Sequence, residues 1–600
     1  MKENQIKGWW KLVAPYSGWV LSIIWLSFLC WLAFLRHLGD TGLVDETEPL
    51  FAEAARQMTV TGDWITPYFN GETRFDKPPL VYWLMAIGYQ IIGVNEWAVR
   101  LPSAVSAIAL SIFCFFTLRF FGFTNINKAK ITPYQLWLAG WLGAAFITLN
   151  IETIIWARTG VSDMLLSGCM GGALFCFFWG YVNRRNREEE INKRDFPSKW
   201  YVAFYLLSAL AVLTKGPVGI VLPGIVIFSF LLYVGKLQEV LQEMQIVKGG
   251  LIFLVLTLPW YFLVTIKNGS AFTDSFFGYH NFERFTGEVN GHGGPWYYYF
   301  LVVLIGFIPW SIYLPLAINR LQWWRLSFWR NQPREAQLGI FALFWFLGVF
   351  AFFTVAVTKL PSYVLPLLCS AAILVALFWS EIVTENSHNL PKNQFGLLLS
   401  GILNSLLLII LAIFFVYSPN VIGSDKAAPN LDQIIAQSNL NWLGGIIWLT
   451  AALIIALLIT APKYWRYLWG VNLVAFIAFI LFVLTPASFL VDNVRQLPLR
   501  ELSTQISQVK QPGEEIIMIG FKKPSLVFYT RNPVKFFNYA QKARRYIKEN
   551  NSSQESTSVL LLIRPKYIQD LKLQPGEYQL ISQQKPYTLI RVSRQTIITN

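Results

Sequence analysis

A succession of long apolar segments constrains the fold of this chain more than any other feature. A helix needs about 20 predominantly apolar residues to cross the hydrocarbon core of a bilayer, and most of these segments approach that length. Backbone inside a bilayer must satisfy its own hydrogen bonds, so such segments fold as helices. The chain is 54% hydrophobic and only 14% charged, which excludes an ordinary soluble enzyme. We therefore predict a polytopic α-helical membrane protein.

The apolar segments predict about thirteen transmembrane helices. The segment 80–92 is not counted, because about 13 residues are too few to cross, and it is predicted to be re-entrant or half-inserted. The spans are expected at 19–35, 99–121, 135–150, 163–183, 201–214, 217–234, 250–266, 296–318, 338–357, 362–380, 397–417, 441–461 and 467–486.

Basic residues in the connecting segments orient these helices. Lysines and arginines gather in 128–130, 184–199, 320–334 and 463–466, which all fall on one side under the predicted alternation. Positive residues concentrate in cytoplasmic loops, so we place that side and the N-terminus in the cytoplasm. The formal charge of +15 then reflects orientation in the plasma (inner) membrane, and no nucleic-acid partner is expected.

Cysteine usage indicates neither a disulfide framework nor a metal site. All five cysteines lie inside apolar runs, without paired or metal-like spacing. They are interpreted as core residues.

The composition of the chain changes near Val494, where hydrophobicity drops. Short strand-like runs follow at 514–521, 525–530, 558–564 and 587–593, and 541–550 is predicted as a helix. No nucleotide-binding fingerprint is present there. We divide the chain into a transmembrane domain, 1–490, and a small soluble α/β domain, 491–600, on the extracytoplasmic side.

The first predicted extracytoplasmic loop, residues 39–79, contains a short helix. Pro49 suits a first helical turn, and apolar residues then recur at helical spacing until Gly62. The pattern predicts an amphipathic helix that lies on the bilayer surface.

The same loop carries charged residues at both ends. Asp45 and Glu46 precede the helix, while Asp76 and Lys77 stand directly before two prolines and another apolar run. We interpret the loop as half of an active site at the membrane surface.

Further charged residues fall on the same predicted side. Asp163 begins a span, where capping of the helix N-terminus is the structural alternative. Lys215 and Lys359 interrupt apolar runs, which is costly unless a lysine is paired or snorkels to the interface. Two such lysines on the side of Lys77 favour an anion-binding cluster, and lipid phosphates reside at that depth.

These motifs resemble those of the polyprenyl-phosphate-sugar glycosyltransferases of the type C membrane fold. The acidic pair before EPLFAE, then GDW, FDKPP and the later HNFERF occur in the expected order, and the resemblance covers roughly the first 365 residues. Within that family the chain is similar to the lipid A aminoarabinose transferases and their protein mannosyltransferase relatives. The resemblance implies catalytic residues Asp45, Glu46 and Asp163, and lipid-phosphate binding by Lys77, Lys215, Arg284, Lys359 and Tyr363.

The implied function is inverting transfer of a sugar from a polyprenyl-phosphate donor to an extracytoplasmic acceptor such as lipid A, a polysaccharide or a protein. A phosphate leaving group departs without a proton when cations hold its charge, so no cofactor is required. A hydroxyl acceptor needs a general base, for which Asp45 is the candidate. The resemblance also implies Asp76 and His280 as ligands of a metal such as zinc, although zinc usually has three or four protein ligands and a plain interfacial histidine is the alternative.

Other functions stay open at this point. A transporter or flippase of lipid-linked sugars would also have many spans, but should show an internal repeat and charges near span centres. A scaffold protein would not need acids and lysines on one face. A polymer ligase is closer, and transfer of a whole glycan block in an acceptor assay would favour it.

Overall fold

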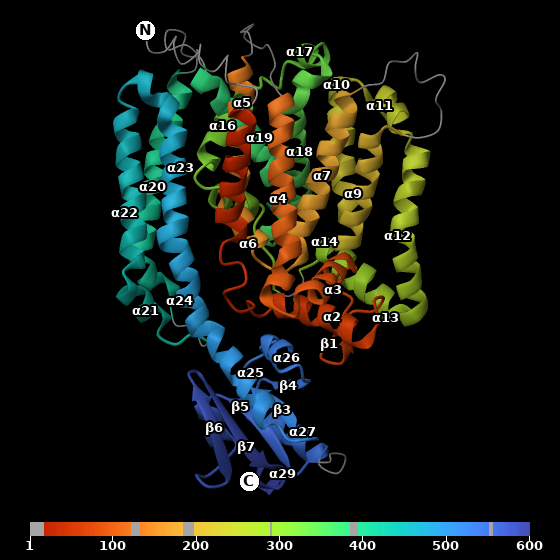
Figure 1. Cartoon of the computed structure of the whole chain (residues 1–600), viewed down its shortest axis with the longest axis vertical. Coiled ribbons are helices and arrows are strands. Elements are labelled where there is room, and N and C mark those ends of the chain that lie inside the picture. The colour runs from red at the N-terminus through yellow and green to blue at the C-terminus, as the bar shows by residue number, and fades with distance from the viewer. Residues whose placement is uncertain are drawn as a thin grey trace.

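The membrane part of the protein is a bundle of long helices, seen side by side in Figure 1. The computed structural model describes residues 17–121, 132–183, 197–288, 291–384, 394–423, 425, 427–550 and 556–599. Within these ranges, nine helices are long and apolar enough to cross a membrane, and two bent helix pairs raise the number to as many as 11. The predicted multi-pass helical fold is confirmed.

The candidate spans lie where apolar segments predicted them. The nine are Ser17–Leu35, α4 (Glu96–Phe120), α7 (Ser162–Val182), α12 (Ile246–Asn268), Arg334–Val355 with α18 (Leu338–Val355), Pro361–Thr384 with η5 (Pro361–Leu367) and α19 (Leu368–Thr384), α20 (Gln394–Ile422), α22 (Leu440–Leu458), and Pro462–Arg495 with α23 (Leu468–Phe479) and α24 (Thr485–Arg495). The bent pairs are α5 (Pro133–Thr148) with α6 (Ile151–Ala157), and α15 (Tyr298–Gly306) with the segment Ser311–Arg320, which contains α16 (Leu314–Arg320).

The predicted thirteen spans include two helices that are shorter than a full span. These are α9 (Lys199–Lys215) and α10 (Val218–Val234), with 17 residues each. Gly216, at a φ of 90°, and Pro217 separate them, because glycine tolerates that backbone conformation and proline does not continue a helix. The basic segments 128–130 and 184–196 lie outside the described residues.

Both bent pairs have a local cause. Asn150 caps both helices at the 65° bend between α5 and α6: its Oδ1 accepts the N–H of Thr153, and its Nδ2 donates to the carbonyls of Phe146 and Ile147. The 118° bend after α15 contains Pro309, which lacks an N–H to continue the helix.

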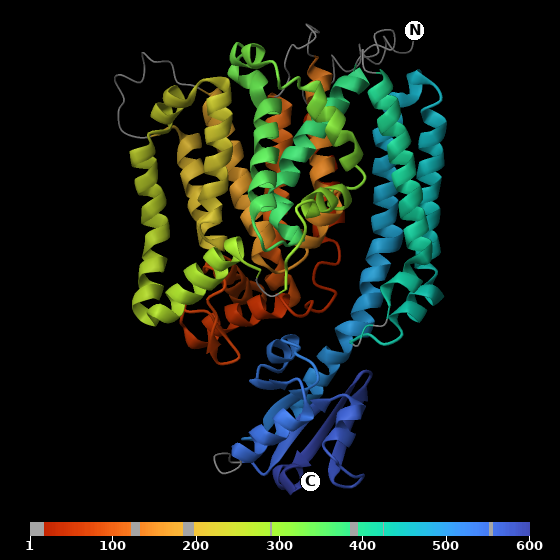
Figure 2. The same cartoon turned by 180° about the vertical axis from the view of Figure 1, so that it is seen from behind.

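The first loop forms a layer at one end of the bundle, visible from both sides in Figures 1 and 2. It contains α2 (Glu48–Thr61), the two-residue strands β1 (Tyr68–Phe69) and β2 (Glu72–Thr73), and α3 (Leu80–Ile92). The predicted helix from Pro49 to Gly62 is therefore present. It packs on α3 through the stacked rings of Phe51 and Tyr82, with centroids 5.5 Å apart, and much of its length is buried in protein.

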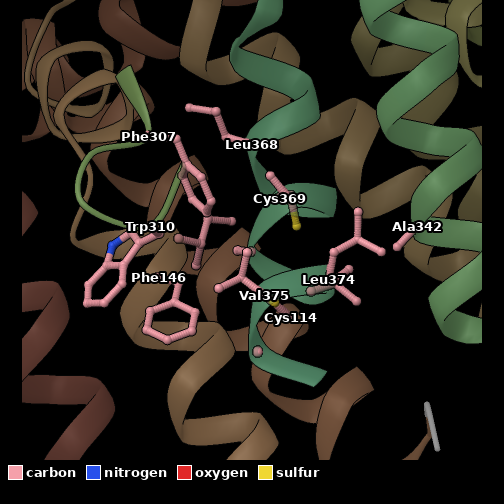
Figure 3. Packing of buried hydrophobic residues seen from close by; sticks show 14 of the residues in the cluster. Cys114, Phe146, Phe307, Trp310, Ala342, Leu368, Cys369, Leu374 and Val375 are labelled. Carbon is pink, nitrogen blue, oxygen red and sulfur yellow. The ribbon is translucent and has the colours of Figure 1, made fainter. Parts of the chain in front are cut away.

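The apolar core lies between the long helices. Figure 3 shows Phe146 and Trp310 packed against each other, with ring centroids 4.2 Å apart, beside Val375 of α19. Cys114 and Cys369 lie in the same cluster. All five cysteines are free and buried, which confirms their interpretation as core residues.

A five-stranded mixed sheet forms the C-terminal domain, which lies beyond the first-loop layer in Figure 1. The strand order is β4-β3-β5-β7-β6, with β3 parallel to β4 and β5 and the other pairs antiparallel. Helix α25 leads from the last span to the sheet. The elements are α25 (Leu497–Val509), β3 (Glu515–Ile519), α26 (Ser525–Thr530), β4 (Val534–Phe537), α27 (Ala540–Glu549), β5 (Ser558–Ile563), α28 (Pro565–Asp570), β6 (Tyr578–Gln584), β7 (Tyr587–Ser593) and α29 (Arg594–Thr599).

One strand prediction in this domain is wrong. The run 525–530 forms helix α26, because Pro524 provides a helix-compatible start and short apolar runs do not distinguish helix from strand. Strands β4 and β6 were not predicted, since their sequences are largely polar or too short to show alternation.

The remaining short elements connect the spans. They are α11 (Leu237–Met244), α13 (Ser270–Thr273), η2 (Asp274–Glu283), α14 (Arg284–Thr286), η3 (Ser311–Tyr313), α17 (Leu326–Arg330), η4 (Arg334–Gln337), α21 (Leu431–Ser438), η6 (Pro462–Tyr467) and η7 (Ile480–Leu484).

Candidate active site

A half-buried ion pair between two helix ends forms the centre of the site. Asp163 lies in the first turn of α7, and Lys215 is the last residue of α9; Nζ of Lys215 lies 2.7 Å from Oδ1 of Asp163. The hydroxyl of Ser362, in η5, also hydrogen-bonds the carboxylate. Asp163 is therefore more than a helix cap.

The ring of Tyr363 lies over the same lysine. Nζ of Lys215 is 5.1 Å from the ring centroid, a distance at which the aromatic face attracts a cation. The ring of Phe353, in α18, also packs against the Tyr363 ring, with centroids 5.0 Å apart. The predicted residues Asp163, Lys215 and Tyr363 are thus brought together from three helical segments.

The end of the first loop contributes a second half-buried carboxylate. Asp76 accepts hydrogen bonds from Nη2 of Arg74, at 2.6 Å, and from the hydroxyl of Tyr82, at 3.1 Å. Burial by itself would raise the pKa of Asp76, but the neighbouring cations Arg74 and Lys77 outweigh it and lower the pKa to about 2. Asp76 is therefore ionised at neutral pH.

Lys77 connects this carboxylate to the central pair. Its Nζ donates to the backbone carbonyl of Asp76 at 2.7 Å and lies 3.9 Å from Oδ2 of the same residue. Burial, with the positive charges of Arg284 and Lys215, lowers the pKa of Lys77 to about 8 against the attraction of Asp76 and Asp163. Arg284 and Lys215 therefore both act electrostatically on Lys77.

Positive charge exceeds negative charge in this cluster. Its cations are Arg74, Lys77, Lys215 and Arg284, and its carboxylates are Asp76 and Asp163. Among the described residues, Arg284 forms no ion pair with a carboxylate. An excess of half-buried positive charge favours binding of an anion.

Unpartnered buried polar atoms surround the same cluster. Buried polar groups normally have hydrogen-bond partners, so several unpaired atoms at one place indicate a ligand site. Within the described part of the chain, atoms without a partner include Nε of Arg74, Nε of Arg284, Nδ1 of His280 and Oγ of Ser162. An anion with several oxygens would match the two guanidinium nitrogens as donors.

The predicted metal ligands Asp76 and His280 lie near each other, and metal binding by them stays a prediction. Asp76 acts electrostatically on His280, yet both Asp76 oxygens already accept hydrogen bonds. Burial, with the nearby cations, lowers the pKa of His280 to about 4, so the ring is neutral at pH 7. No group of three His, Cys, Asp or Glu residues within metal-binding reach occurs among the described residues, and two ligands do not fit zinc.

The structure does not bring Lys359 into this cluster. Its Nζ donates to the carbonyls of Thr354 and Ala356, at 3.0 and 2.9 Å, and lies over the ring of Tyr299. These carbonyls belong to the C-terminal end of α18, where a cation is favourable. The chain turns sharply between α18 and η5, and Lys359 lies in that turn. Lys359 is therefore a buried lysine at a helix end.

The acidic pair of the first loop faces the C-terminal domain. The Asp45 carboxylate accepts hydrogen bonds from the N–H and hydroxyl of Ser525, at 3.0 and 2.6 Å. Burial raises the pKa of Asp45, while these two hydrogen bonds act in the opposite direction. Glu46 is exposed. The catalytic roles of both residues stay predictions.

Glu48 links the first loop to the turn that carries Asp163. Its Oε1 accepts the N–H of Gly160 at 2.7 Å, and its Oε2 accepts the N–H of Val44 at 2.8 Å. Arg100 of α4 pairs with Glu48 at 2.8 Å, and both side chains are almost fully buried. This pair positions the segment before Asp45 against the segment before Asp163.

Several of these residues were not singled out from the sequence. Glu48 is part of the EPLFAE motif and Arg74 stands beside FDKPP, so the motifs marked their neighbourhood. Tyr82, Arg100 and Ser525 carried no such signal, because a tyrosine in an apolar helix, an arginine near a helix start and a serine in a soluble domain are ordinary.

Comparisons with known proteins agree with this fold. The family described as dolichyl-phosphate-mannose-protein mannosyltransferase matches residues 76–172. The family described as cyanobacterial RgtA-type glycosyltransferase, C-terminal domain, matches residues 509–600. The fold resembles the crystal structure of ArnT from Cupriavidus metallidurans bound to undecaprenyl phosphate, with a TM-score of 0.70, 20% identity, and coverage of 96% of this chain and 98% of that chain.

Sequence relatives extend the comparison. The undecaprenyl phosphate-alpha-4-amino-4-deoxy-L-arabinose arabinosyl transferase of Shewanella sediminis is 30% identical over 343 residues, which cover 57% of each protein. An Aquifex aeolicus protein described as uncharacterized is 31% identical over 58% of this chain and 68% of its own length. Fold and site together define a multi-pass membrane protein with a cation-rich cluster at one end of its helices. The chain belongs to the polyprenyl-phosphate-sugar glycosyltransferases of the type C membrane fold.

Proposed function

We propose that this protein transfers a sugar from an undecaprenyl-phosphate-type donor to an acceptor on the extracytoplasmic face of the membrane. The observation that carries the proposal is the excess of half-buried cations, Lys77 and Arg284, beside the Lys215–Asp163 pair. A lipid phosphate is the anion that reaches this position at the end of the helices. The arabinosyl transferase names of the relatives support this donor class.

The cations stabilise the leaving group. When the bond between the anomeric carbon and the phosphate oxygen breaks, negative charge grows on the lipid phosphate. Lys77 and Arg284 hold that charge at fixed positions away from bulk water, where such stabilisation is strongest. The phosphate leaves as an anion and needs no proton.

The carboxylates act on the acceptor. Asp163 is neutralised by Lys215 and orients groups at the centre of the site. Asp45, whose pKa is raised by burial, serves as the base that takes the proton of an acceptor hydroxyl. One displacement at the anomeric carbon then inverts its configuration.

The residues of this chain perform each of these steps. Asp76 and His280 do not provide a zinc site on their own, so no step is assigned to a metal, and metal binding there stays a prediction. The first-loop layer and the C-terminal domain lie at the same end of the bundle, which we assign to the extracytoplasmic side (Figures 1 and 2).

Reconstituted transfer tests the proposal. The purified full chain in liposomes is given a panel of undecaprenyl-phosphate sugars labelled in the sugar, with a bacterial membrane extract as acceptor. We expect release of undecaprenyl phosphate and movement of the label. Asp45→Asn should reduce transfer by about 10²- to 10⁴-fold, the usual contribution of a general base.

A matched control distinguishes loss of the proposed base from loss of any negative charge in the same loop. Asp40→Asn removes a carboxylate of the same loop that is 47% exposed and pairs with His37, and it should leave transfer unchanged. Absence of sugar transfer from every donor would overturn the proposed function. Full transfer by Asp45→Asn would remove Asp45 from the mechanism.

A further inference from the structure

The C-terminal domain touches the first loop at the residue proposed as the base. Ser525, the first residue of α26, donates its N–H to Oδ1 of Asp45 and its hydroxyl to Oδ2. Both carboxylate oxygens are thus held by one residue of another domain. Hydrogen bonds to an ionised group are roughly twice as strong as neutral ones, so this contact restrains the carboxylate.

Two neighbouring contacts fix how α26 and the sheet sit on the loop. The hydroxyl of Tyr529 accepts the N–H of Leu43 at 2.9 Å and donates to Oε1 of Glu96 at 2.8 Å. Asn70 pairs with the backbone of Val534 in both directions, at 2.8 and 2.9 Å. The domain is therefore docked at three points on the loop that carries Asp45.

The docked loop is tied to the centre of the site. Glu48 binds the backbone of Val44, directly before Asp45, and the backbone of Gly160, three residues before Asp163. A shift of Asp45 is thus coupled through Glu48 to the turn at the start of α7.

We propose that Ser525 is a positioning residue for Asp45, so that the C-terminal domain completes the acceptor side of the active site. This inference rests on the proposed function, in which Asp45 acts on the acceptor. Ser525 itself touches no reacting atom. Its two hydrogen bonds set the orientation of the carboxylate and leave a lone pair of each oxygen for the acceptor.

Other charged groups also act on Asp45 and shape the test. Lys523 lowers the pKa of Asp45 and Glu46 raises it, and Asp45 in turn acts on the hydroxyl of Tyr587. Ser525→Ala leaves these groups in place and removes only the hydroxyl. It therefore raises the pKa of Asp45, and the acid limb of the kcat–pH profile should move to higher pH.

Hydrogen–deuterium exchange of the full chain in detergent measures the contact without activity. Ser525→Ala and Asp45→Asn should both increase backbone exchange in residues 42–48 at least about threefold, because each weakens the contact: the first removes the hydroxyl donor, and the second removes the charge of the acceptor. Ser525→Thr keeps a hydroxyl and should restore protection. Ser503→Ala removes another buried serine hydroxyl of this domain, one that bonds only its own helix at Leu499, and should change nothing.

Transfer kinetics then measure the consequence for the reaction. With the donor accepted by the wild type, Ser525→Ala should lower kcat by about 10- to 100-fold, since misplacement of a reacting group by about 1 Å costs that much. The KM for the donor should stay unchanged, and Ser525→Thr should recover most of the loss.

The two proposals fail differently. Unchanged exchange in residues 42–48 of Ser525→Ala, or unchanged kcat and pH profile, would overturn the positioning role while transfer by the wild type still supports the proposed function. Loss of kcat without a pH shift and without rescue by Ser525→Thr would also overturn it, because a purely structural defect has that signature. If the wild type transfers no sugar, the proposed function fails.

Discussion

Two clusters of buried charge lie at opposite ends of the same helices, α7 and α18, and they differ in how their polar groups are satisfied. At one end, Arg334 donates to Glu243 at 2.8 and 2.9 Å and to the carbonyl of Tyr181 at 2.8 Å. Glu239 lies 3.2 Å from the same guanidinium. At the other end, the cluster around Asp163 has more cations than carboxylates and contains unpartnered nitrogens.

This difference distinguishes a charge cluster with a structural role from one with a role in ligand binding. A buried charge whose partners are all supplied by the protein fastens helices together, and removing one partner leaves a costly unpaired charge. A buried charge that the protein leaves incompletely paired is costly unless something else binds it. The Arg334 cluster is therefore expected to determine stability, and the Asp163 cluster to determine ligand binding.

The largest expected effect is on stability, at the satisfied cluster. Arg334→Met leaves Glu239 and Glu243 without their buried cation and should lower the free energy of unfolding by about 3–5 kcal/mol. Denaturant unfolding in micelles measures the change. Arg330→Met, at the same end on a more exposed side chain, is the control. Equal stability of the two variants would contradict the comparison.

The next effect is on transfer, at the unsatisfied cluster. Arg284→Gln and Lys77→Met should each reduce kcat by about 10²- to 10³-fold, the usual loss when one charge-stabilising donor is removed. Both should fold normally. Lys267→Met, which removes an exposed lysine paired with Asp63, should transfer sugar like the wild type. A wild-type rate in either cluster variant would mean that the excess charge does not serve the reaction.

A smaller effect should appear as a pH dependence of lipid binding. Lys77 binds phosphate only as the ammonium ion, and burial lowers its pKa to about 8. Affinity for undecaprenyl phosphate should therefore be constant below that pH and fall about tenfold by pH 9, which corresponds to about 1.4 kcal/mol. Fluorescence titration measures it. Lys77→Arg stays charged, so a similar fall in that variant would point to another group.

The smallest effect is expected at Lys359. The sequence grouped this lysine with Lys77 and Lys215, but its Nζ binds the carbonyls that end α18. Lys359→Met should change the affinity for undecaprenyl phosphate by less than about threefold, or roughly 0.65 kcal/mol. A tenfold loss would place Lys359 in the anion site after all.

Much of the fold could be predicted from local patterns. The helix from Pro49 to Gly62 and the short segment 80–92 lie at their predicted positions as α2 and α3, because apolar periodicity and helix-ending residues act within a few turns. The run 525–530 shows the limit of prediction from local patterns. Its six residues, a mixture of apolar and polar side chains, suit a strand or a helix equally. Its surroundings made it α26, whose first residue holds Asp45.

The sequence by itself determined that this chain is a multi-pass helical protein and which charged residues are out of place in it, since the cost of burying charge in hydrocarbon does not depend on the fold. Only the tertiary structure decided which of those charges meet. Lys215 pairs with Asp163 across 52 positions, and Asp45 binds Ser525 across 480, whereas Lys359 binds carbonyls within five residues of itself. Such pairings depend on how helices pack and where domains dock, which no local pattern records.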